Sequence, residues 1–170
     1  MRKLNPTNRA WLKGIHILFI SVWTGAAFCM LLLQFATNPT SGDEMYATNS
    51  AIKLIDDFIV IPTAIGSLLT GLLISWLTPW GFFKWRWITL KWILTISVIL
   101  FGTFALGPWL NGMTEISGAE RAAALQNSTY TSYKQLLAAF SSPQILLLVG
   151  MVFLSVIKPW ARKKKQAQEN

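Results

Sequence analysis

The sequence predicts an all-α integral membrane protein, a bundle of four helices that each cross a lipid bilayer. Of its 170 residues, 53% are hydrophobic and only 13% are charged, whereas a soluble domain carries about 25% charged residues. Four separate apolar stretches reach the roughly 20 residues that a helix needs to cross the hydrocarbon layer. None of them alternates with the period of two that is typical of transmembrane strands. We therefore expect one transmembrane domain over residues 1–170.

The four apolar stretches set the expected bounds of the spans, which are residues 11–36, 58–77, 87–110 and 143–160. In hydrocarbon every backbone amide needs a partner, and a helix supplies that partner from within itself. The first long loop, residues 37–57, contains the turn signals Asn38-Pro39 and Ser41-Gly42. Asp56-Asp57 is expected to cap the second span, because acidic residues favour the N-terminus of a helix.

The second long loop, residues 112–142, carries an amphipathic pattern. Apolar residues recur there at spacing i, i+3, i+4 and i+7, at Tyr133, Leu136, Leu137 and Phe140. This spacing places them on one face of a helix. We expect a helix that lies on the outer membrane surface or extends the fourth span.

The charged residues are unequally divided between the two sides of the predicted bundle. The N-terminal segment, the short second loop and the basic tail at residues 161–170 carry most of the Lys and Arg residues, whereas the long loops are mainly acidic. Basic residues stay on the cytoplasmic side. Both termini are therefore predicted to be cytoplasmic, with the protein in the bacterial cytoplasmic membrane. The net charge of +8 reflects this topology, and no nucleic-acid partner is expected.

Two ionisable residues, His16 and Lys91, lie within the predicted spans, where a charged side chain costs about 2.5–3.5 kcal/mol on insertion scales. His16 is about one turn inside the first span and Lys91 about one turn inside the third. The topology places both at a similar depth near the cytoplasmic ends, where they are able to face each other. His16 also shares a helix face with Trp23, seven residues further along.

Two interpretations of His16 stay open. In the first, the imidazole is an axial ligand of haem b, since neutral imidazole is a usual ligand of haem iron, and Lys91 pairs with a propionate. Because His16 is the only histidine, the second axial position would fall to Met30, Met151, a second subunit or nothing. In the second interpretation, His16 hydrogen-bonds backbone or water, and Lys91 extends its ammonium group to the interface.

A stripe of small residues marks the second span, at Thr63, Ser67, Gly71 and Ser75. Small side chains let neighbouring helices approach closely in a membrane. The stripe therefore predicts close packing of this span within the bundle. The same feature allows a homodimer, which the sequence leaves open.

Short motifs in all four predicted spans share a pattern with one known family. They are Trp11-Leu-Lys-Gly-Ile-His16, Trp23-Thr-Gly25, Pro62 with Gly71, Trp87-Ile-Thr-Leu-Lys91 and Lys158-Pro159-Trp160. In these motifs the chain resembles the HemJ/CopD-like family of small four-helix bacterial membrane proteins, and the HemJ-type protoporphyrinogen oxidases in particular. The resemblance implies haem b as cofactor and an oxidoreductase activity on protoporphyrinogen IX. It also implies that His16 and Lys91 correspond to the His and Lys of that family's first and third spans.

The chain departs from the family pattern after the first span. An Arg and a second His are replaced there by Leu31-Leu-Leu-Gln34-Phe35-Ala-Thr37. Three function classes follow: a non-catalytic or accessory four-span membrane protein, a haem b-binding redox protein of the protoporphyrinogen oxidase type, and a small transporter. The predicted cofactor-binding residues are His16, Lys91 and Trp23, with His16 at the haem iron. The lipid bilayer is the one partner that every class shares.

Overall fold

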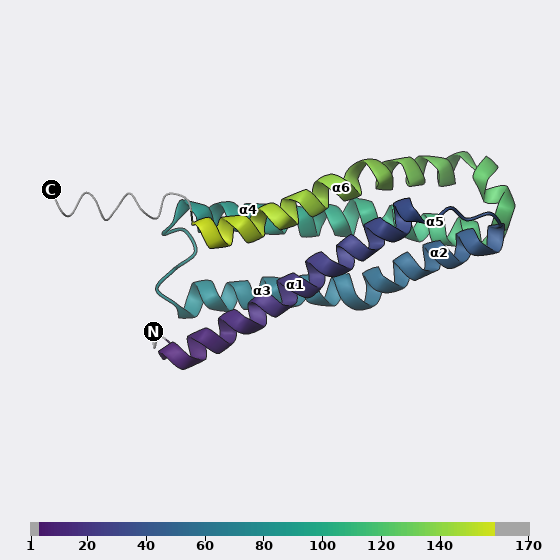
Figure 1. The fold of residues 1–170 in the computed structure, drawn as a ribbon. Coiled ribbons are helices and arrows are strands. Elements are labelled where there is room, and N and C mark those ends of the chain that lie inside the picture. Colours follow the sequence, from purple (N-terminus) through teal and green to yellow (C-terminus); the bar gives the residue numbers. More distant parts are fainter. Residues whose placement is uncertain (1–3, 159–170) are drawn as a thin grey trace.

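The computed structural model describes residues 4–158, which form four long helical rods that run side by side (Figure 1). The first rod is α1 (Pro6–Ala36). The second joins α2 (Gly42–Ile55), η1 (Asp56–Val60) and α3 (Ile61–Leu77). The third joins α4 (Arg86–Phe101), η2 (Gly102–Leu106) and α5 (Gly107–Glu120), and a short 3-10 helix, η3 (Arg121–Gln126), leads to the fourth rod, α6 (Ser128–Ile157).

Each rod is long and apolar enough to cross a membrane. The predicted all-α four-helix bundle is therefore confirmed. The first described residue, Leu4, and the last, Lys158, lie at the same end of the bundle, which we call the terminal end (Figure 1). The predicted basic tail, residues 161–170, and Trp160 lie outside the described residues.

The prediction of a long first loop over residues 37–57 is wrong for most of that range, because α2 begins at Gly42. The turn signals Asn38-Pro39 and Ser41 end just before this helix. The Ser41 side chain accepts a hydrogen bond from the amide of Glu44, which caps the helix, and acidic residues in its first turn complement the helix dipole. The second rod therefore starts much earlier than its apolar stretch.

The helix expected in the second long loop is confirmed, and it extends the fourth span. It begins at Ser128, where the Asn127 side chain accepts hydrogen bonds from the amides of Thr129 and Tyr130. Of the predicted amphipathic face, Leu137 is buried in the core. The rod then continues without interruption through Pro143 to Ile157.

Two π-helical segments, η1 and η2, interrupt the second and third rods at equivalent places. In each, the residue before a proline donates its amide to the carbonyl five residues earlier, Ile61 to Asp56 and Gly107 to Gly102. The following residue, Pro62 or Pro108, has no amide hydrogen, and its ring would clash with the carbonyl four residues earlier. A wider turn just before the proline keeps the neighbouring backbone groups paired.

The rods pack around two apolar clusters. The cluster nearer the terminal end is formed by side chains from α1, α3, α4 and α6. They are Trp23, Ala64, Val98, Leu148 and Met151. The second cluster lies in the other half of the bundle and is formed by side chains from α2, α5, η3 and α6. It includes Met45, Ile52, Leu110, Met113, Tyr130 and Leu137. Helix α1 packs along α3, and α2 packs along α5. In the described chain, α3 and α4 share hardly any close backbone contact.

The small-residue stripe on the second rod lies in the bundle interior, as predicted. Ser67 and Ser75 are buried. At Gly71, an added Cβ atom would lie 3.3 Å from Cε1 of His16, so α1 and α3 come together closely there. Trp92 of α4 donates from its indole nitrogen to Ser75 Oγ, which links α4 to the same face.

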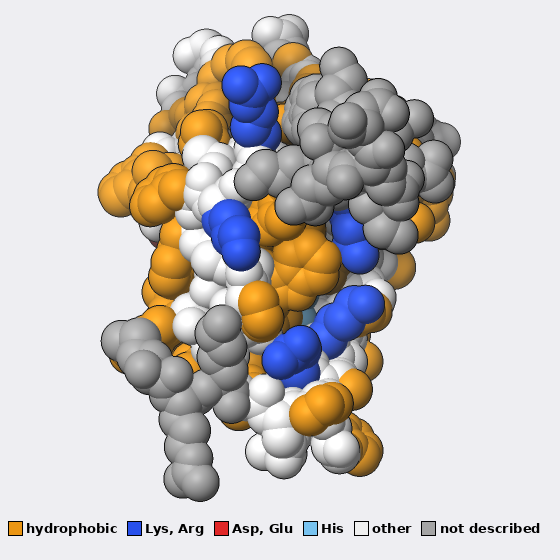
Figure 2. Space-filling model, turned by 90° about the vertical axis from the view of Figure 1, so that its left-hand side faces the viewer, with side chains coloured by type: hydrophobic (Ala, Val, Ile, Leu, Met, Phe, Trp, Pro, Cys, Tyr) orange, Lys and Arg blue, Asp and Glu red, His pale blue; other side chains and the backbone are white. Residues whose placement is uncertain are grey.

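The terminal end of the bundle is basic. Figure 2 views the molecule from this end and shows Lys and Arg side chains around an apolar centre. In the described chain the basic residues of this end are Arg9, Lys13, Lys84, Arg86 and Lys158. The side of the membrane on which this end lies stays a prediction.

The start of the second rod gives a test of the packing. A Cβ atom at Gly42 would overlap the backbone nitrogen of Ala122 and lie 2.7 Å from the carbonyl carbon of Arg121. Arg121 already has a φ of 51°, which few non-glycine residues adopt, so the backbone has little freedom to move. We expect Gly42→Ala to lower the free energy of unfolding by about 1–3 kcal/mol, measured by equilibrium unfolding in mixed micelles.

The matched control is Gly150→Ala, because a Cβ atom at Gly150 would meet no atom within 4 Å. That change should leave the free energy of unfolding within about 0.5 kcal/mol of the wild type. Equal effects of the two substitutions would contradict the packing described for the α2–η3 contact.

Candidate functional site

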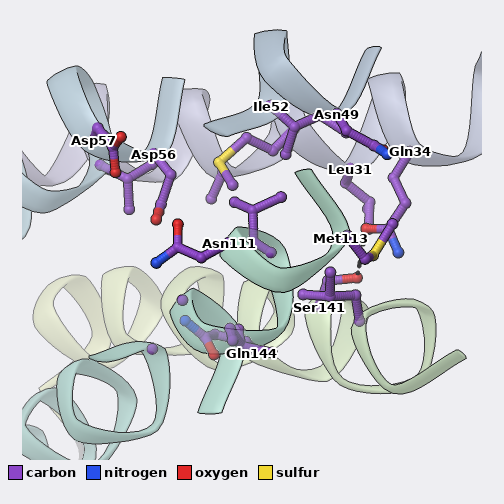
Figure 3. Close-up of a pocket in the computed structure, with 18 of the residues that line it drawn as sticks. Leu31, Gln34, Asn49, Ile52, Asp56, Asp57, Asn111, Met113, Ser141 and Gln144 are labelled. Carbon is purple, nitrogen blue, oxygen red and sulfur yellow. Dashed lines mark hydrogen bonds between the residues drawn. The ribbon is translucent and has the colours of Figure 1, made fainter. Parts of the chain in front are cut away.

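A cavity of about 530 Å³ lies between the four rods, and we call it the central cavity (Figure 3). Its walls are mainly apolar, with residues from every rod, among them Trp23, Ala27, Ile52, Ala64, Val98 and Leu137. Several of these side chains belong to the two core clusters. The cavity therefore occupies the place where the two clusters meet.

The two π-helical segments border the central cavity. Asp56 and Val60 of η1 line it, as do Gly102, Thr103 and Leu106 of η2. A π-turn carries one residue more than an α-turn between the hydrogen-bonded groups and widens the helix locally, and such turns are frequent at functional sites. The same local adjustment that accommodates the prolines thus shapes the walls of this space.

Polar side chains from three rods meet across the cavity. Figure 3 shows Asp56 of the second rod, Asn111 of the third and Gln144 of the fourth around the same space. The Oε1 atom of Gln144 is buried and has no hydrogen-bond donor among the described residues. Further along, Ser141 donates to Oε1 of Gln34, with 3.3 Å between the oxygens.

A buried network fixes the wall farther from the terminal end. Nδ2 of Asn49 donates to Oγ of Ser117 at 3.0 Å and to the hydroxyl of Tyr130 at 3.2 Å. All three side chains are buried, so these bonds supply the partners that buried polar groups require. The network ties α2, α5 and α6 together beside the cavity.

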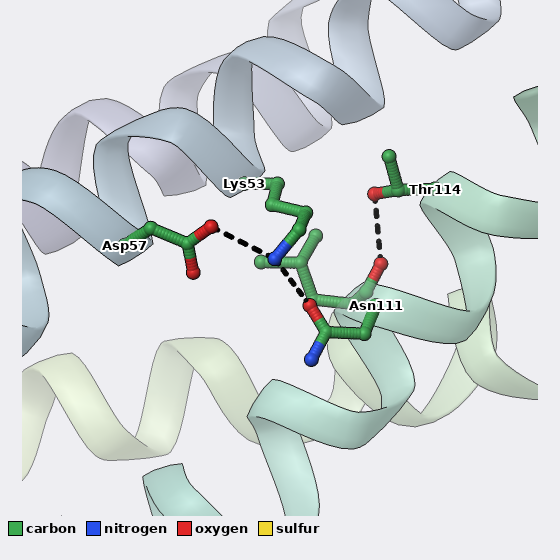
Figure 4. Close-up of polar contacts among 5 residues, drawn as sticks. Lys53, Asp57, Asn111 and Thr114 are labelled. Atoms are coloured by element: carbon green, nitrogen blue, oxygen red, sulfur yellow. Dashed lines mark hydrogen bonds and ion pairs between the residues drawn. The ribbon is translucent and has the colours of Figure 1, made fainter.

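Lys53 bridges the second and third rods at the rim of the cavity (Figure 4). Its Nζ atom donates to Oδ2 of Asp57 at 2.8 Å and to Oδ1 of Asn111 at 2.7 Å. Both acceptors also line the cavity. The charge of Lys53 is therefore compensated by Asp57, whereas Asp56 makes no side-chain hydrogen bond with any residue in the described range.

On one side the cavity reaches the surface of the bundle. Ile61 and Ile65 of α3 both line the cavity, and they are 46% and 51% exposed. They lie in the apolar part of the second rod, whereas the exposed lining residues Asn111 and Lys134 give the cavity a polar border elsewhere.

The structure places the predicted residue His16 between α1 and α3. Its Nδ1 atom lies 2.8 Å from the hydroxyl oxygen of Thr70, and this hydroxyl donates its own hydrogen to the carbonyl of Gly66. When the hydroxyl donates to this carbonyl, it accepts from the ring, which corresponds to a neutral imidazole with its hydrogen on Nδ1. The lone pair of the ring is then on Nε2.

Lys91 points into the bundle. Its Nζ atom donates to Oγ of Ser155 at 2.7 Å, and it is close enough to His16 for its charge to act on the imidazole. Neither residue lines the central cavity, whereas the third predicted residue, Trp23, does. The three predicted residues are therefore divided between the cavity and a separate polar layer nearer the terminal end.

Two further residues were considered as the second ligand of a haem iron bound by His16. Met30 lies fourteen residues beyond His16 on α1, which is about 21 Å along the helix axis, so one iron cannot reach both. Met151 is buried in the core cluster nearer the terminal end, where its sulfur accepts a hydrogen bond from Thr95. The part of the chain that the structure describes contains no group of three His, Cys, Asp or Glu residues able to hold a metal ion.

A comparison with protein families matches residues 10–159 to the family described as "Predicted integral membrane protein (DUF2269)". The chain belongs to this family. Together with the four apolar rods, this membership makes it a multi-pass integral membrane protein that resides in a lipid bilayer. Searches of curated proteins and of solved structures gave no match. The resemblance of this DUF2269 protein to the HemJ/CopD-like group stays a prediction.

Sequence reasoning missed most of the polar residues of the cavity in the DUF2269 protein. The interpretation of Asp56-Asp57 as a helix cap is wrong, because both lie in a π-helical segment in the middle of a rod. Asn111 and Gln144 were not singled out, although each interrupts or borders an apolar stretch. The sequence did carry a signal for them, because each is a side-chain amide in or next to an apolar stretch and lies close to a proline. Asn111 follows Pro108, and Gln144 follows Pro143.

The Lys53 bridge provides a second test. Hydrogen bonds that involve a charged group contribute about 1.5–3 kcal/mol, and this lysine is partly exposed, so we expect Lys53→Ala to lower the free energy of unfolding by about 1 kcal/mol. A double-mutant cycle of Lys53→Ala with Asn111→Ala should give a coupling energy of about 0.5–1 kcal/mol, measured by unfolding in mixed micelles.

Lys134 provides the matched control, because it is exposed and makes no hydrogen bond or ion pair with a described residue. Lys134→Ala should change the free energy of unfolding by less than about 0.5 kcal/mol. A coupling energy near zero between Lys53 and Asn111 would show that the two rods are not joined through this contact.

Proposed function

We propose that this DUF2269 protein binds a small, largely apolar molecule in its central cavity, and that it acts as a non-catalytic binding protein or small transporter in the membrane. The observation that carries the proposal is the cavity itself, of about 530 Å³, with apolar walls and a few polar groups. Ligand sites in proteins have volumes of about 300–1,000 Å³ and the same mixture of wall types.

The position of the cavity supports a ligand that comes from the lipid phase. Its opening beside Ile61 and Ile65 lies on an apolar, exposed surface of α3. A strongly hydrated molecule would lose its water on this route, whereas an apolar one would not. The ligand is therefore mainly apolar, with a small polar part that reaches the side chains in the cavity.

Filling the cavity tests this proposal. Ala64 is buried in its wall, so the ring of Ala64→Phe would project into the space. We expect native mass spectra of the wild type, extracted in mild detergent, to show bound small molecules that the Ala64→Phe variant has lost. Gly150→Phe is the control, since the side chain at this position points into open space, and it should retain them.

Two results would contradict the proposal. One is a wild-type spectrum without any bound molecule, in detergent and in lipid nanodiscs alike. The other is equal retention in the Ala64→Phe and Gly150→Phe proteins, which would place the bound molecules on the lipid-facing surface.

A second candidate function is redox chemistry with haem b at His16, as the HemJ/CopD-like resemblance implies. The specific observation in its favour is the hydrogen bond from Nδ1 to Thr70, which orients the ring and leaves the Nε2 lone pair available to iron. Lys91 lies nearby and would pair with a propionate. Because His16 does not line the central cavity, this site would be distinct from the ligand site proposed above.

An absorption spectrum tests the haem candidate. If His16 binds haem iron, protein purified after growth with a haem precursor should show a Soret band that His16→Ala abolishes. Met30→Leu should keep the band, because Met30 is too far along α1 to share the iron. A colourless wild-type protein that also fails to take up added haemin would exclude this candidate.

A further inference from the structure

Two charged residues that line the central cavity, Asp56 on the second rod and the exposed Lys134 on the fourth, make no side-chain hydrogen bond or ion pair with the described part of the chain. The cation nearest to Asp56, Lys53, donates to Asp57 and Asn111 instead. The three charges of Lys53, Asp56 and Asp57 therefore leave one negative charge on this side of the cavity.

An unpaired carboxylate is costly in a space with apolar walls at membrane depth. Charged groups in such surroundings are normally paired or solvated, because loss of water costs several kcal/mol. A cation that enters the cavity would offset this cost, while an anion would add to it. The preference for a cation thus applies to the wall formed by the second rod, around Asp56, and not to the wall that carries Lys134.

One hydrogen-bond acceptor that lines the cavity together with Asp56 lacks a donor from the described residues. Oε1 of Gln144 is buried without a donor, and Oδ1 of Asn111 already acts as an acceptor for Lys53. Figure 3 shows Asp56, Asn111 and Gln144 on different helices around one space. A protonated amine has three N–H donors and no acceptor, and so is able to donate to Asp56 and to Oε1 of Gln144 together.

The remaining walls argue for an organic cation rather than a metal ion. Beyond these polar groups the cavity is lined by Trp23, Ala64 and Val98, which offer no ligand to a metal. The described residues contain no cluster of three His, Cys, Asp or Glu side chains for a metal. An apolar group attached to the amine would instead fill this part of the cavity.

We propose that the ligand of the central cavity is an amphipathic amine, whose ammonium group pairs with Asp56 and donates to Gln144, and whose apolar part packs against the wall around Trp23. This inference rests on the proposed function and specifies the chemical class of its ligand. Asp56 and Gln144 would then determine specificity, and Ala64 would determine the available volume.

Three probes that share one apolar part and differ in their polar end test the inference: phenylbutylamine, phenylbutanol and phenylbutanoate. Apparent affinities are obtained from the ligand dependence of the Tm of the full-length protein in a mild non-ionic detergent. A hydrogen bond with a charged group contributes about 1.5–3 kcal/mol, so the amine should bind about tenfold or more tightly than the alcohol. The carboxylate should bind most weakly. This comparison needs no variant.

Substitutions assign the preference to a residue. Asp56→Asn should weaken binding of the amine by about tenfold while the affinity for the alcohol stays within about twofold. Asp43→Asn is the matched control, because Asp43 is exposed and lies away from the cavity, and it should change neither affinity. Ala64→Phe should abolish the binding of both the amine and the alcohol.

The outcomes separate the two proposals. If the amine and the alcohol bind equally, and Ala64→Phe abolishes both, then the cavity binds ligands but the pairing with Asp56 is wrong. If no probe raises the Tm in a manner that depends on Ala64, both the ligand class and the proposed function are wrong. An amine preference that persists in Asp56→Asn would also overturn the assignment to Asp56.

Discussion

The requirement that every backbone amide in hydrocarbon be paired determines how this bundle is built. A loop or a broken helix cannot face lipid, so a proline within a span, such as Pro62 or Pro108, must be accommodated inside a continuous rod. Pro62 and Pro108 each remove one amide donor, and the π-helical segments before them, η1 and η2, keep the adjoining groups bonded. The wider turns that result lie on either side of the central cavity. The shape of the candidate site thus follows from the way in which backbone amides and carbonyls near the prolines stay hydrogen-bonded in lipid.

The polar side chains follow the same arrangement. In each half of the bundle some of them are held by partners from another rod, as with His16 and Thr70 nearer the terminal end and Asn49 and Ser117 in the other half. Asp56 and Gln144 are different, because each presents an acceptor to the cavity without a donor from the described chain. A native interior leaves few such groups unpaired. Buried polar atoms without a partner also occur at Arg9, Thr24, Ser50 and Trp87, but these residues do not line the cavity. The position of Asp56 and Gln144 in the cavity wall is therefore what distinguishes them.

Sequence reasoning was successful where one residue type and its position along the chain carry the information. Hydropathy located the four spans, because lipid acts on each helix separately, and His16 and Lys91 were conspicuous as ionisable residues in apolar runs. The start of the second rod at Gly42 was not predicted, because the capping residue Ser41 lies in a polar segment whose composition is typical of a loop. Asp56, Asn111 and Gln144 were missed as a site because their meeting depends on how three rods pack. The π-turns were also not predicted, since a proline in a span is equally compatible with a simple kink.

The length of the rods has a consequence for where the site lies. The second helical stretch, Gly42–Leu77, has 36 residues and is about 54 Å long, whereas the hydrocarbon layer is about 30 Å thick. Away from the terminal end, the bundle must therefore emerge from the membrane as a folded helical cap. The buried bonds of Asn49 with Ser117 and Tyr130 join three helices in this part of the bundle. The cavity extends from the apolar cluster around Trp23 to Asn49 and Tyr130 of this network, so a bound molecule would meet apolar side chains at one end and polar side chains at the other.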